Sequence, residues 1–169
     1  EPDLDFQLRG EQNVKPWLEQ MIVTVKKFDP NHLVTVGYSN IESGEILKDK
    51  VDFVSYHYYE DSSLFEDKLA VLEKATKKPL VVQEFGLSSN RGLWSWFGNS
   101  KNVQANYHKK MQSIFKKKKL AFVSWTLYDF PEVPDKVAGK WPWIKNKQKQ
   151  FGFIDSEGKK KPSFLYINN

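Results

Sequence analysis

The octapeptide PLVVQEFG, residues 79–86, joins a short apolar run to a polar pair and then to a glycine. Lys78-Pro79 breaks the helical pattern that precedes it, and Leu80-Val81-Val82 has the length and β-branched content of a buried strand. Glu84 stands just beyond this run, where a carboxylate is partly removed from water at a cost in free energy. Such a cost is typical of acids that serve a function. The stretch therefore predicts a strand whose carboxyl end carries a functional acid.

The same pattern recurs along the chain, with helical patterns between the copies. Short apolar runs predict four strands, at 32–36, 51–56, 80–82 and 120–125. Helical spacing predicts three helices, and the first of them is expected to bury one face made of Val14, Trp17, Leu18, Met21, Ile22, Val25 and Phe28. The other two helices are expected at 65–75 and 103–115. Strands joined by helical crossovers lie parallel, so we expect one α/β domain over residues 1–169.

Polar and aromatic residues follow these predicted strands, at the edge where parallel α/β sheets bind ligands. His57 and Tyr59 follow the second strand, Glu84 the third, and Trp125 ends the fourth. Hydrogen-bonding side chains and a flat indole beside a carboxylate favour chemistry on a sugar. The alternatives are a structural ion pair or a surface acid for Glu84, and ordinary core or rim side chains for His57 and Tyr59.

Further tryptophans lie in the long segments after the third and fourth strands: Trp94, Trp96, Trp141 and Trp143. Their flat faces suit pyranose rings, and capping of the core is the alternative. Cysteine is absent, which excludes disulfides, thiolate metal sites and cysteine nucleophiles. His32 and His108 look structural by position, so we predict no metal and no cofactor.

The net charge of +5 arises largely from two lysine runs, Lys116–Lys119 and Lys159–Lys161. Each run lies between an apolar segment and a loop or strand, so we expect solvated turns. Nucleic-acid binding ranks last among the functions considered, because the lysines are not interleaved with aromatic residues. No apolar run approaches the roughly 18 residues of a membrane span, so no span is expected.

Several motifs occur in a recognisable order: EP at 1–2, DPNHLVTVG at 29–37, HYY at 57–59, PLVVQEFG at 79–86, SW at 124–125 and FGFIDSEGKKKPS at 151–163. Together they resemble the second half of the clan A glycoside hydrolases, most closely the cellulase and mannanase-like enzymes of family 5. The resemblance covers nearly the whole chain. It implies the C-terminal half of a (β/α)8 TIM barrel, that is, strands five to eight with their helices.

The resemblance also implies a role for each site residue. Glu84 matches the nucleophile of the seventh barrel strand, and Glu1-Pro2 matches the general acid/base motif of the fourth, although the preceding asparagine is absent. His57 and Tyr59 match sixth-strand residues near the nucleophile, and Trp125 matches the indole under the sugar. Such enzymes are retaining, with carboxyl groups about 5 to 5.5 Å apart.

The implied function is a retaining O-glycosyl hydrolase of a β-linked polysaccharide or oligosaccharide, in a parent enzyme that is secreted or periplasmic. A whole barrel takes about 250 residues, so we expect this chain to need the other half of the barrel, a homodimer mate or a larger parent. A half-barrel leaves two strand edges unpaired. The main alternative is a carbohydrate-binding or interaction module of the same fold that does no chemistry.

Overall fold

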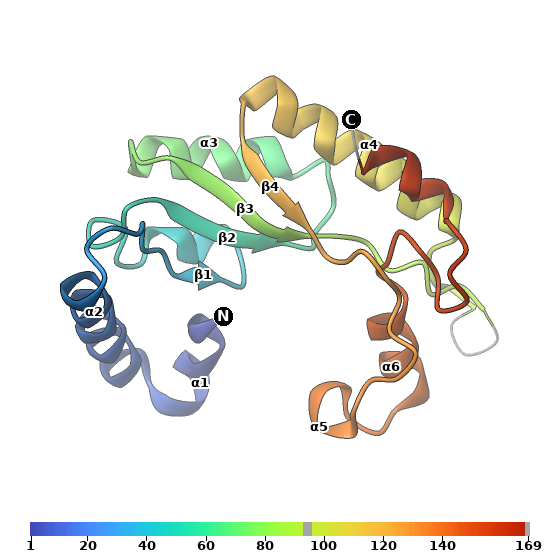
Figure 1. Cartoon of the computed structure of the whole chain (residues 1–169), viewed down its shortest axis with the longest axis horizontal. Helices are drawn as coiled ribbons and strands as arrows, with labels where there is room; N and C mark the ends of the chain where they lie inside the picture. The colour runs from blue at the N-terminus through green and yellow to red at the C-terminus, as the bar shows by residue number, and fades with distance from the viewer. Residues whose placement is uncertain (93–95, 168–169) are drawn as a thin grey trace. The chain divides into compact units, whose positions relative to one another are not determined.

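The computed structural model describes residues 1–92 and 96–167 and is drawn in Figure 1. The chain forms two compact units. The first unit comprises Glu1–Glu84 and Lys119–Val123, and the second comprises Phe85–Lys118 and Ser124–Asn169. The prediction of a single domain stays a prediction. Within the described ranges, no helix combines the length and the apolar character that crossing a bilayer requires.

The first unit contains the sheet. Its strands are β1 (Gly37–Tyr38), β2 (Val54–Tyr58), β3 (Leu80–Phe85) and β4 (Ala121–Ser124), and they lie in the order β1-β2-β3-β4. β1 pairs with β2 in parallel, with Gly37 opposite Ser55, and all four arrows point the same way in Figure 1. Its helical elements are η1 (Pro2–Asp5), α1 (Phe6–Arg9), α2 (Glu11–Phe28), η2 (Glu42–Glu45) and α3 (Phe65–Ala75). The predicted α/β class with parallel strands is confirmed.

The prediction of a strand at 32–36 is wrong, because regular pairing begins only at Gly37. The backbone nitrogen of Val34 instead donates to the Asp52 carboxylate at 2.7 Å, and the Thr35 hydroxyl donates to the Phe53 carbonyl at 2.7 Å. Side chains thus provide hydrogen bonds that a strand ladder would otherwise make. The β-branched content of the segment does not reveal that side chains make these hydrogen bonds.

β2 and α3 form the core of the first unit. All five residues of β2 are buried. The Tyr58 ring meets Phe65 of α3 edge to face, with ring centroids 4.8 Å apart. α3 lies where a helix is predicted, and it buries Phe65, Leu69 and Leu72, which recur at helical spacing. The helical spacing in the sequence therefore identified this contact correctly.

α2 buries only part of its predicted face. Val14, Leu18 and Ile22 are its buried residues. Four other members of that face are exposed by 40 to 79%, namely Trp17, Met21, Val25 and Phe28. The prediction that they lie in the core of this chain is wrong. They form a second apolar row, which we call the outer stripe of α2.

The second unit is built around α4 (Lys101–Lys118), which packs on η3 (Pro162–Tyr166). Phe85 contacts Phe115 and His108 of α4, with ring centroids 4.9 and 5.2 Å apart. His108 in turn contacts Phe153, with centroids 4.5 Å apart. Two further helices, α5 (Asp135–Ala138) and α6 (Pro142–Lys149), occupy a segment in which the sequence predicts only loop.

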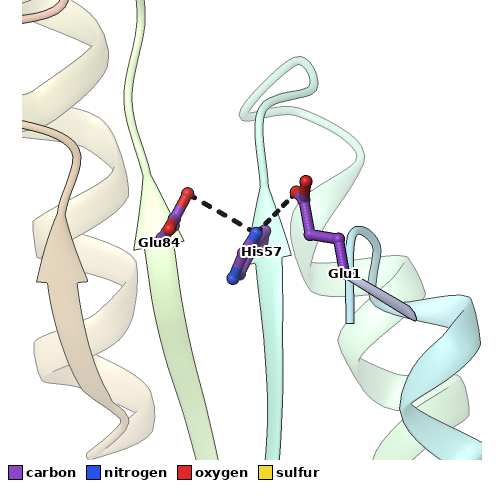
Figure 2. Close-up of side chains that lie close together, drawn as sticks. All are labelled: Glu1, His57 and Glu84. Atoms are coloured by element: carbon purple, nitrogen blue, oxygen red, sulfur yellow. Dashed lines mark hydrogen bonds and ion pairs between the residues drawn. The ribbon is translucent and has the colours of Figure 1, made fainter. Parts of the chain in front are cut away.

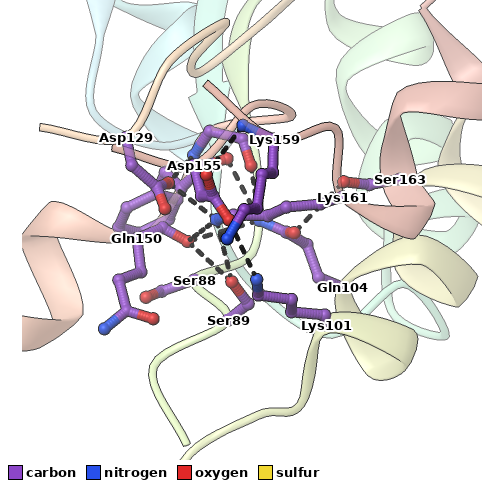
Figure 3. Close-up of polar contacts among 12 residues, drawn as sticks. Ser88, Ser89, Lys101, Gln104, Asp129, Gln150, Asp155, Lys159, Lys161 and Ser163 are labelled. Atoms are coloured by element: carbon purple, nitrogen blue, oxygen red, sulfur yellow. Dashed lines mark hydrogen bonds and ion pairs between the residues drawn. The ribbon is translucent and has the colours of Figure 1, made fainter. Parts of the chain in front are cut away.

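A buried polar cluster joins the loops of the second unit (Figure 3). Lys161 Nζ lies 2.7 Å from Asp129 Oδ1 and also donates to Ser89 and to the Gln150 carbonyl. Burial raises the pKa of Asp129 and lowers the pKa of Lys161, and the hydrogen bond between them opposes both shifts. The prediction of a solvated lysine run is therefore wrong for Lys161, which is 3% exposed.

Candidate active site

β2 and β3 bring His57 and Glu84 to one edge of the sheet. Each residue lies near the carboxyl end of its strand, and neighbouring parallel strands end at the same edge. Figure 2 shows the His57 side chain between those of Glu84 and Glu1, the latter contributed by the first residue of the sequence. Three residues that are far apart in sequence thus meet in space.

His57 contacts both carboxylates. A hydrogen bond of 2.7 Å joins His57 Nδ1 to Glu1 Oε1, and the same nitrogen lies 3.5 Å from Glu84 Oε2. One oxygen of each glutamate and a ring nitrogen of His57 all lie within 4.8 Å of one another. The His57 side chain is 8% exposed, against 38% for Glu1 and 27% for Glu84. A buried imidazole therefore supports two acids that remain open to solvent.

Tyr59 follows β2 directly and orients the Glu84 carboxylate. Its hydroxyl donates to Glu84 Oε2 at 2.6 Å. Hydrogen bonds of this length to a carboxylate are among the strong ones in proteins, because the acceptor is charged. The structure thus brings together four of the five predicted site residues, all in the first unit: Glu1, His57, Tyr59 and Glu84.

Asp3 anchors the turn that begins at Glu1. Its carboxylate accepts hydrogen bonds from the backbone nitrogen of Ser39 at 3.0 Å, the Ser39 hydroxyl at 2.5 Å and the Asn40 amide at 3.1 Å. Ser39 and Asn40 follow β1, so the turn is tied to the sheet edge. Sequence reasoning missed Asp3, whose only signal is its place two residues after the predicted acid/base.

Trp125, the fifth predicted residue, belongs to the second unit and follows β4. Its backbone nitrogen donates to the Phe85 carbonyl at 2.8 Å, and its peptide bond to Thr126 is cis. A Cβ atom on Gly86 would lie 2.3 Å from the Trp125 carbonyl oxygen, so a side chain at position 86 would clash with that backbone. Close packing against the Trp125 backbone thus explains why a glycine ends the stretch PLVVQEFG.

Glu1, His57 and Glu84 also offer one potential metal-ligand atom each. Imidazole and carboxylate groups bind several divalent transition metals. However, His57 Nδ1 and Glu1 Oε1 are already hydrogen-bonded to each other. Two glutamates are also the groups that a retaining glycosidase uses for catalysis without a metal. The prediction that the chain uses no metal stays a prediction.

Three of the four remaining predicted tryptophans, Trp96, Trp141 and Trp143, lie in the described part of the second unit. Trp94 lies outside the described residues. Trp96 is exposed, and Trp141 and Trp143 stand at the start of α6. Asp129 also follows the fourth strand in sequence. It is buried and hydrogen-bonded to Lys161, so its role is structural.

Comparison with known proteins identifies the family. The model of the cellulase family, glycosyl hydrolase family 5, matches residues 1–131. A probable mannan endo-1,4-beta-mannosidase C of Aspergillus terreus is 26% identical, and the match covers 52% of this chain and 28% of that protein.

Solved structures show a shared fold. An active-site mutant of Rhizomucor miehei beta-1,3-glucanosyltransferase in complex with laminaritriose matches with a TM-score of 0.71 at 16% identity, over 94% of this chain and 59% of its own. Ruminococcus gnavus beta-glucuronidase matches with a TM-score of 0.69 at 16% identity, over 90% of this chain and 28% of its own. An endo-laminarinase from Formosa matches with a TM-score of 0.65 at 14% identity, over 87% of this chain and 50% of its own.

These structures have the TIM-barrel fold, and the chain spans only part of each, as expected for half a barrel. The predicted fold class and the predicted resemblance are both confirmed. Because the family model covers 131 of the 169 residues, the chain belongs to glycosyl hydrolase family 5.

Proposed function

We propose that this chain carries the two catalytic carboxylates of a retaining glycoside hydrolase that acts on a β-linked polysaccharide or oligosaccharide. The observation that supports this most directly is the approach of Glu1 and Glu84, whose nearest ligand oxygens lie within 4.8 Å. Retaining glycosidases have carboxyl groups about 5 to 5.5 Å apart, whereas inverting enzymes need about 6.5 to 9.5 Å to admit a water.

In the first step, a Glu84 oxygen attacks the anomeric carbon of the sugar and forms an ester bond to it. The glycosidic bond between that carbon and the leaving oxygen breaks, and Glu1 gives its proton to the leaving oxygen. In the second step, a water oxygen attacks the same carbon while Glu1 takes the proton of the water. The ester bond breaks, and both glutamates return to their starting states.

The neighbouring residues hold these groups in position. The Tyr59 hydroxyl fixes one oxygen of Glu84, so the other oxygen is free to attack. His57 keeps Glu1 facing Glu84 through its 2.7 Å hydrogen bond. The family resemblance assigns a separate role to Trp125 of the second unit, whose flat ring is 36% exposed and would stack on the apolar face of a hexose. The names of the relatives, a mannan endo-1,4-beta-mannosidase and a beta-1,3-glucanosyltransferase, favour a β-linked hexose chain as the substrate.

Replacement of Glu84 by glutamine in the full-length protein tests the proposal. We expect turnover to fall by at least about a thousandfold while oligosaccharides still bind, since the nucleophile is lost but the binding surface remains. Incubation of the native protein with an activated 2-fluoro glycoside should leave a covalent adduct on Glu84, visible by peptide mass spectrometry. Unchanged turnover in the variant, or an adduct on another residue, contradicts the proposal.

Glu60→Gln is the matched control. Glu60 also follows β2, but its carboxylate is engaged by Lys68 at 2.6 Å. Its replacement should leave turnover near the native value. If the protein only binds sugar, then the native protein and both variants should show no turnover and no covalent adduct. This result would distinguish a binding module from the proposed enzyme.

We further propose that the remaining βα units of a barrel pair with this chain, supplied by a longer parent, a partner half or a second copy. β1 and β4 are the outer strands of the described sheet, and Val123 of β4 is 58% exposed. The outer stripe of α2 adds apolar surface that a neighbouring helix would cover. The chain spans 28 to 59% of the relatives compared above, which leaves room for such units.

Val123→Lys tests the pairing. In this chain expressed alone, we expect the lysine to reduce self-association, because a charge on an edge strand opposes pairing with another strand. Val71→Lys on α3 is the matched control, since Val71 is 62% exposed but lies on a helix. Sedimentation velocity measures both. A native chain that stays monomeric at all concentrations, or equal effects of the two variants, contradicts edge pairing.

A further inference from the structure

Two stacked tryptophans stand at the start of α6. The rings of Trp141 and Trp143 have centroids 4.8 Å apart and an interplanar angle of 24°. Both are well exposed, Trp141 by 59% and Trp143 by 49%. They cover one face of each other and leave the outer faces open. The pair lies beyond residue 131, so it falls outside the part of the chain that the family model matches.

The segment that carries the pair is fixed by hydrogen bonds within the second unit. The Ser88 hydroxyl donates to the Lys147 carbonyl at 2.6 Å, and the Asn146 amide donates to the Asn90 carbonyl at 3.0 Å. An ion pair between Lys145 and Asp135 joins α6 to α5. The Gln150 carbonyl, just past α6, accepts from the buried Lys161 (Figure 3). The indoles therefore stand on an anchored segment, which lowers the entropy cost of binding a ligand.

A small cavity lies on the same segment. It has a volume of about 170 Å³ and an apolar wall made by Phe130, Val137 and Trp125, so the segment adjoins the ring that the proposed function already places under a sugar. Glu132 and Gln148 also line it and can exchange hydrogen bonds with hydroxyl groups. The cavity thus combines an aromatic wall with a few polar groups, the composition of a small-molecule site.

We propose that the α5–α6 segment is a second sugar-binding surface, on which Trp141 and Trp143 stack the hexose rings of a β-linked oligosaccharide. The C–H groups on the face of a pyranose are attracted to the negative face of an indole, and its hydroxyls point outward to water or polar side chains. Lys140 precedes the pair in sequence, and Lys145 follows it and is ion-paired with Asp135, so polar groups occur on the same segment as the two rings. This proposal rests on the proposed function, because it takes the same class of ligand.

The test compares oligosaccharides of different length in the full-length protein with Glu84→Gln, so that hydrolysis does not consume the ligand. Isothermal titration calorimetry measures the affinity of laminarihexaose, mannohexaose and cellohexaose and of the three trisaccharides. Trp141→Ala combined with Trp143→Ala should weaken the tightest-binding hexasaccharide by about tenfold, as expected for the loss of one or two stacked rings. Trp143→Phe, which keeps a smaller ring, should weaken it less.

Trp96→Ala is the matched control, because Trp96 is also exposed, by 76%, and lies on a different segment. It should change the affinity by less than twofold. Equal affinity in the native and double variants, equal losses in the double and Trp96 variants, or no binding of any hexasaccharide overturns the proposal. The proposal also fails if the double variant keeps its sugar affinity but no longer self-associates. The tryptophan pair would then bind a second copy of the chain and not a sugar.

The two proposals fail separately. If the native protein hydrolyses no glycoside but hexasaccharide affinity depends on the tryptophan pair, the proposed enzyme fails and the sugar-binding surface stands. If the native protein hydrolyses oligosaccharides and the double variant binds them normally, the surface alone fails.

Discussion

The Asp3 carboxylate accepts hydrogen bonds from both the backbone nitrogen and the hydroxyl of Ser39, at 3.0 and 2.5 Å. This contact spans 36 residues of sequence and ties the turn after Glu1 to the end of β1. Because Glu1 has its own hydrogen bond to His57 on β2, the proposed acid/base is held from two strands. Asp3 is thus a positioning residue and does not itself contact Glu84 in the structure.

Asp3→Ala should lower kcat in the full-length protein by about ten- to hundredfold while KM changes little. The reason is that a displacement of about 1 Å in a catalytic group has this effect on rate without removing substrate contacts. Asp3→Asn keeps one acceptor oxygen for Ser39 and should restore part of the activity. Steady-state kinetics on a soluble oligosaccharide measures both variants.

Asp5→Ala serves as the control for Asp3. Asp5 lies in the same turn, but its carboxylate pairs with the exposed Arg9, at 3.5 Å. Its loss should leave kcat within about twofold of the native value, since exposed ion pairs contribute little. If Asp5→Ala and Asp3→Ala reduce kcat equally, the turn is sensitive to any change and Asp3 has no special positioning role.

Tyr59→Phe should reduce kcat/KM by about ten- to hundredfold. The change removes the 2.6 Å hydrogen bond to Glu84 and leaves the ring, and a hydrogen bond to a charged group contributes about 1.5 to 3 kcal/mol. Kinetics on the same oligosaccharide measures the loss. Turnover equal to that of the native protein would show that Glu84 is oriented by other groups.

Tyr58→Phe is the adjacent comparison. The Tyr58 hydroxyl donates to the Asp61 carbonyl at 2.7 Å, away from Glu84. Its removal should lower the free energy of unfolding by about 1 kcal/mol and leave kcat/KM near the native value. Opposite outcomes for the two tyrosines would separate orientation of the nucleophile from general stability.

The sequence predicted those parts of the site that follow from strand and helix periodicity. Glu84 and His57 were found because each stands at the end of an apolar run, and parallel strands must end at one edge. The fold class followed from the same alternation. The strand at 32–36 was misplaced because the Asp52 and Thr35 side chains make hydrogen bonds there beside the backbone bond from Asp52 to the Val34 carbonyl, so the segment does not pair regularly.

Contacts between distant residues could not be predicted in this way. Lys161 looks like Lys159 and Lys160 in sequence, yet it is buried because Asp129, 32 residues earlier, faces it. Asp3 depends in the same way on Ser39. The outer stripe of α2 is apolar at helical spacing, so periodicity assigns it to a core, yet its four side chains are exposed in the described part of the chain. In each case the deciding partner lies outside the local pattern.

Lys161→Ala should destabilise the second unit strongly, by about 3 to 5 kcal/mol. Removing one member of a buried ion pair leaves the other charge, here Asp129, without compensation. Lys160→Ala is the neighbouring control, because Lys160 is exposed and lies over the Phe164 ring at 4.3 Å from its centroid. That contact contributes about 0.5 to 1 kcal/mol. Urea unfolding measures both variants, and equal losses would contradict a structural role for the buried pair.

Stability should fall between about pH 6.5 and pH 4 because of His108. Burial lowers its pKa to about 4, and the positive charge of Lys161 adds to the effect, whereas an unfolded histidine has a pKa of about 6.5. Between these values the unfolded chain binds more protons than the folded chain, so acid favours unfolding. From pH 8 to pH 5, His108 alone should lower the free energy of unfolding by about 2 kcal/mol.

His108→Leu should remove that contribution, so the variant should lose about 2 kcal/mol less than the native chain between pH 8 and pH 5. Aspartates that lose stabilising contacts in acid, such as Asp52 and Asp155, act equally in both proteins and cancel in the comparison. His32→Leu is the control, because the His32 side chain is 81% exposed, and it should retain the native pH dependence. Urea unfolding at the two pH values decides the matter. If the difference between the native and His108→Leu chains is the same at pH 8 and pH 5, then the pKa of His108 is the same in the folded and unfolded chains, which contradicts its shielding from water in the second unit.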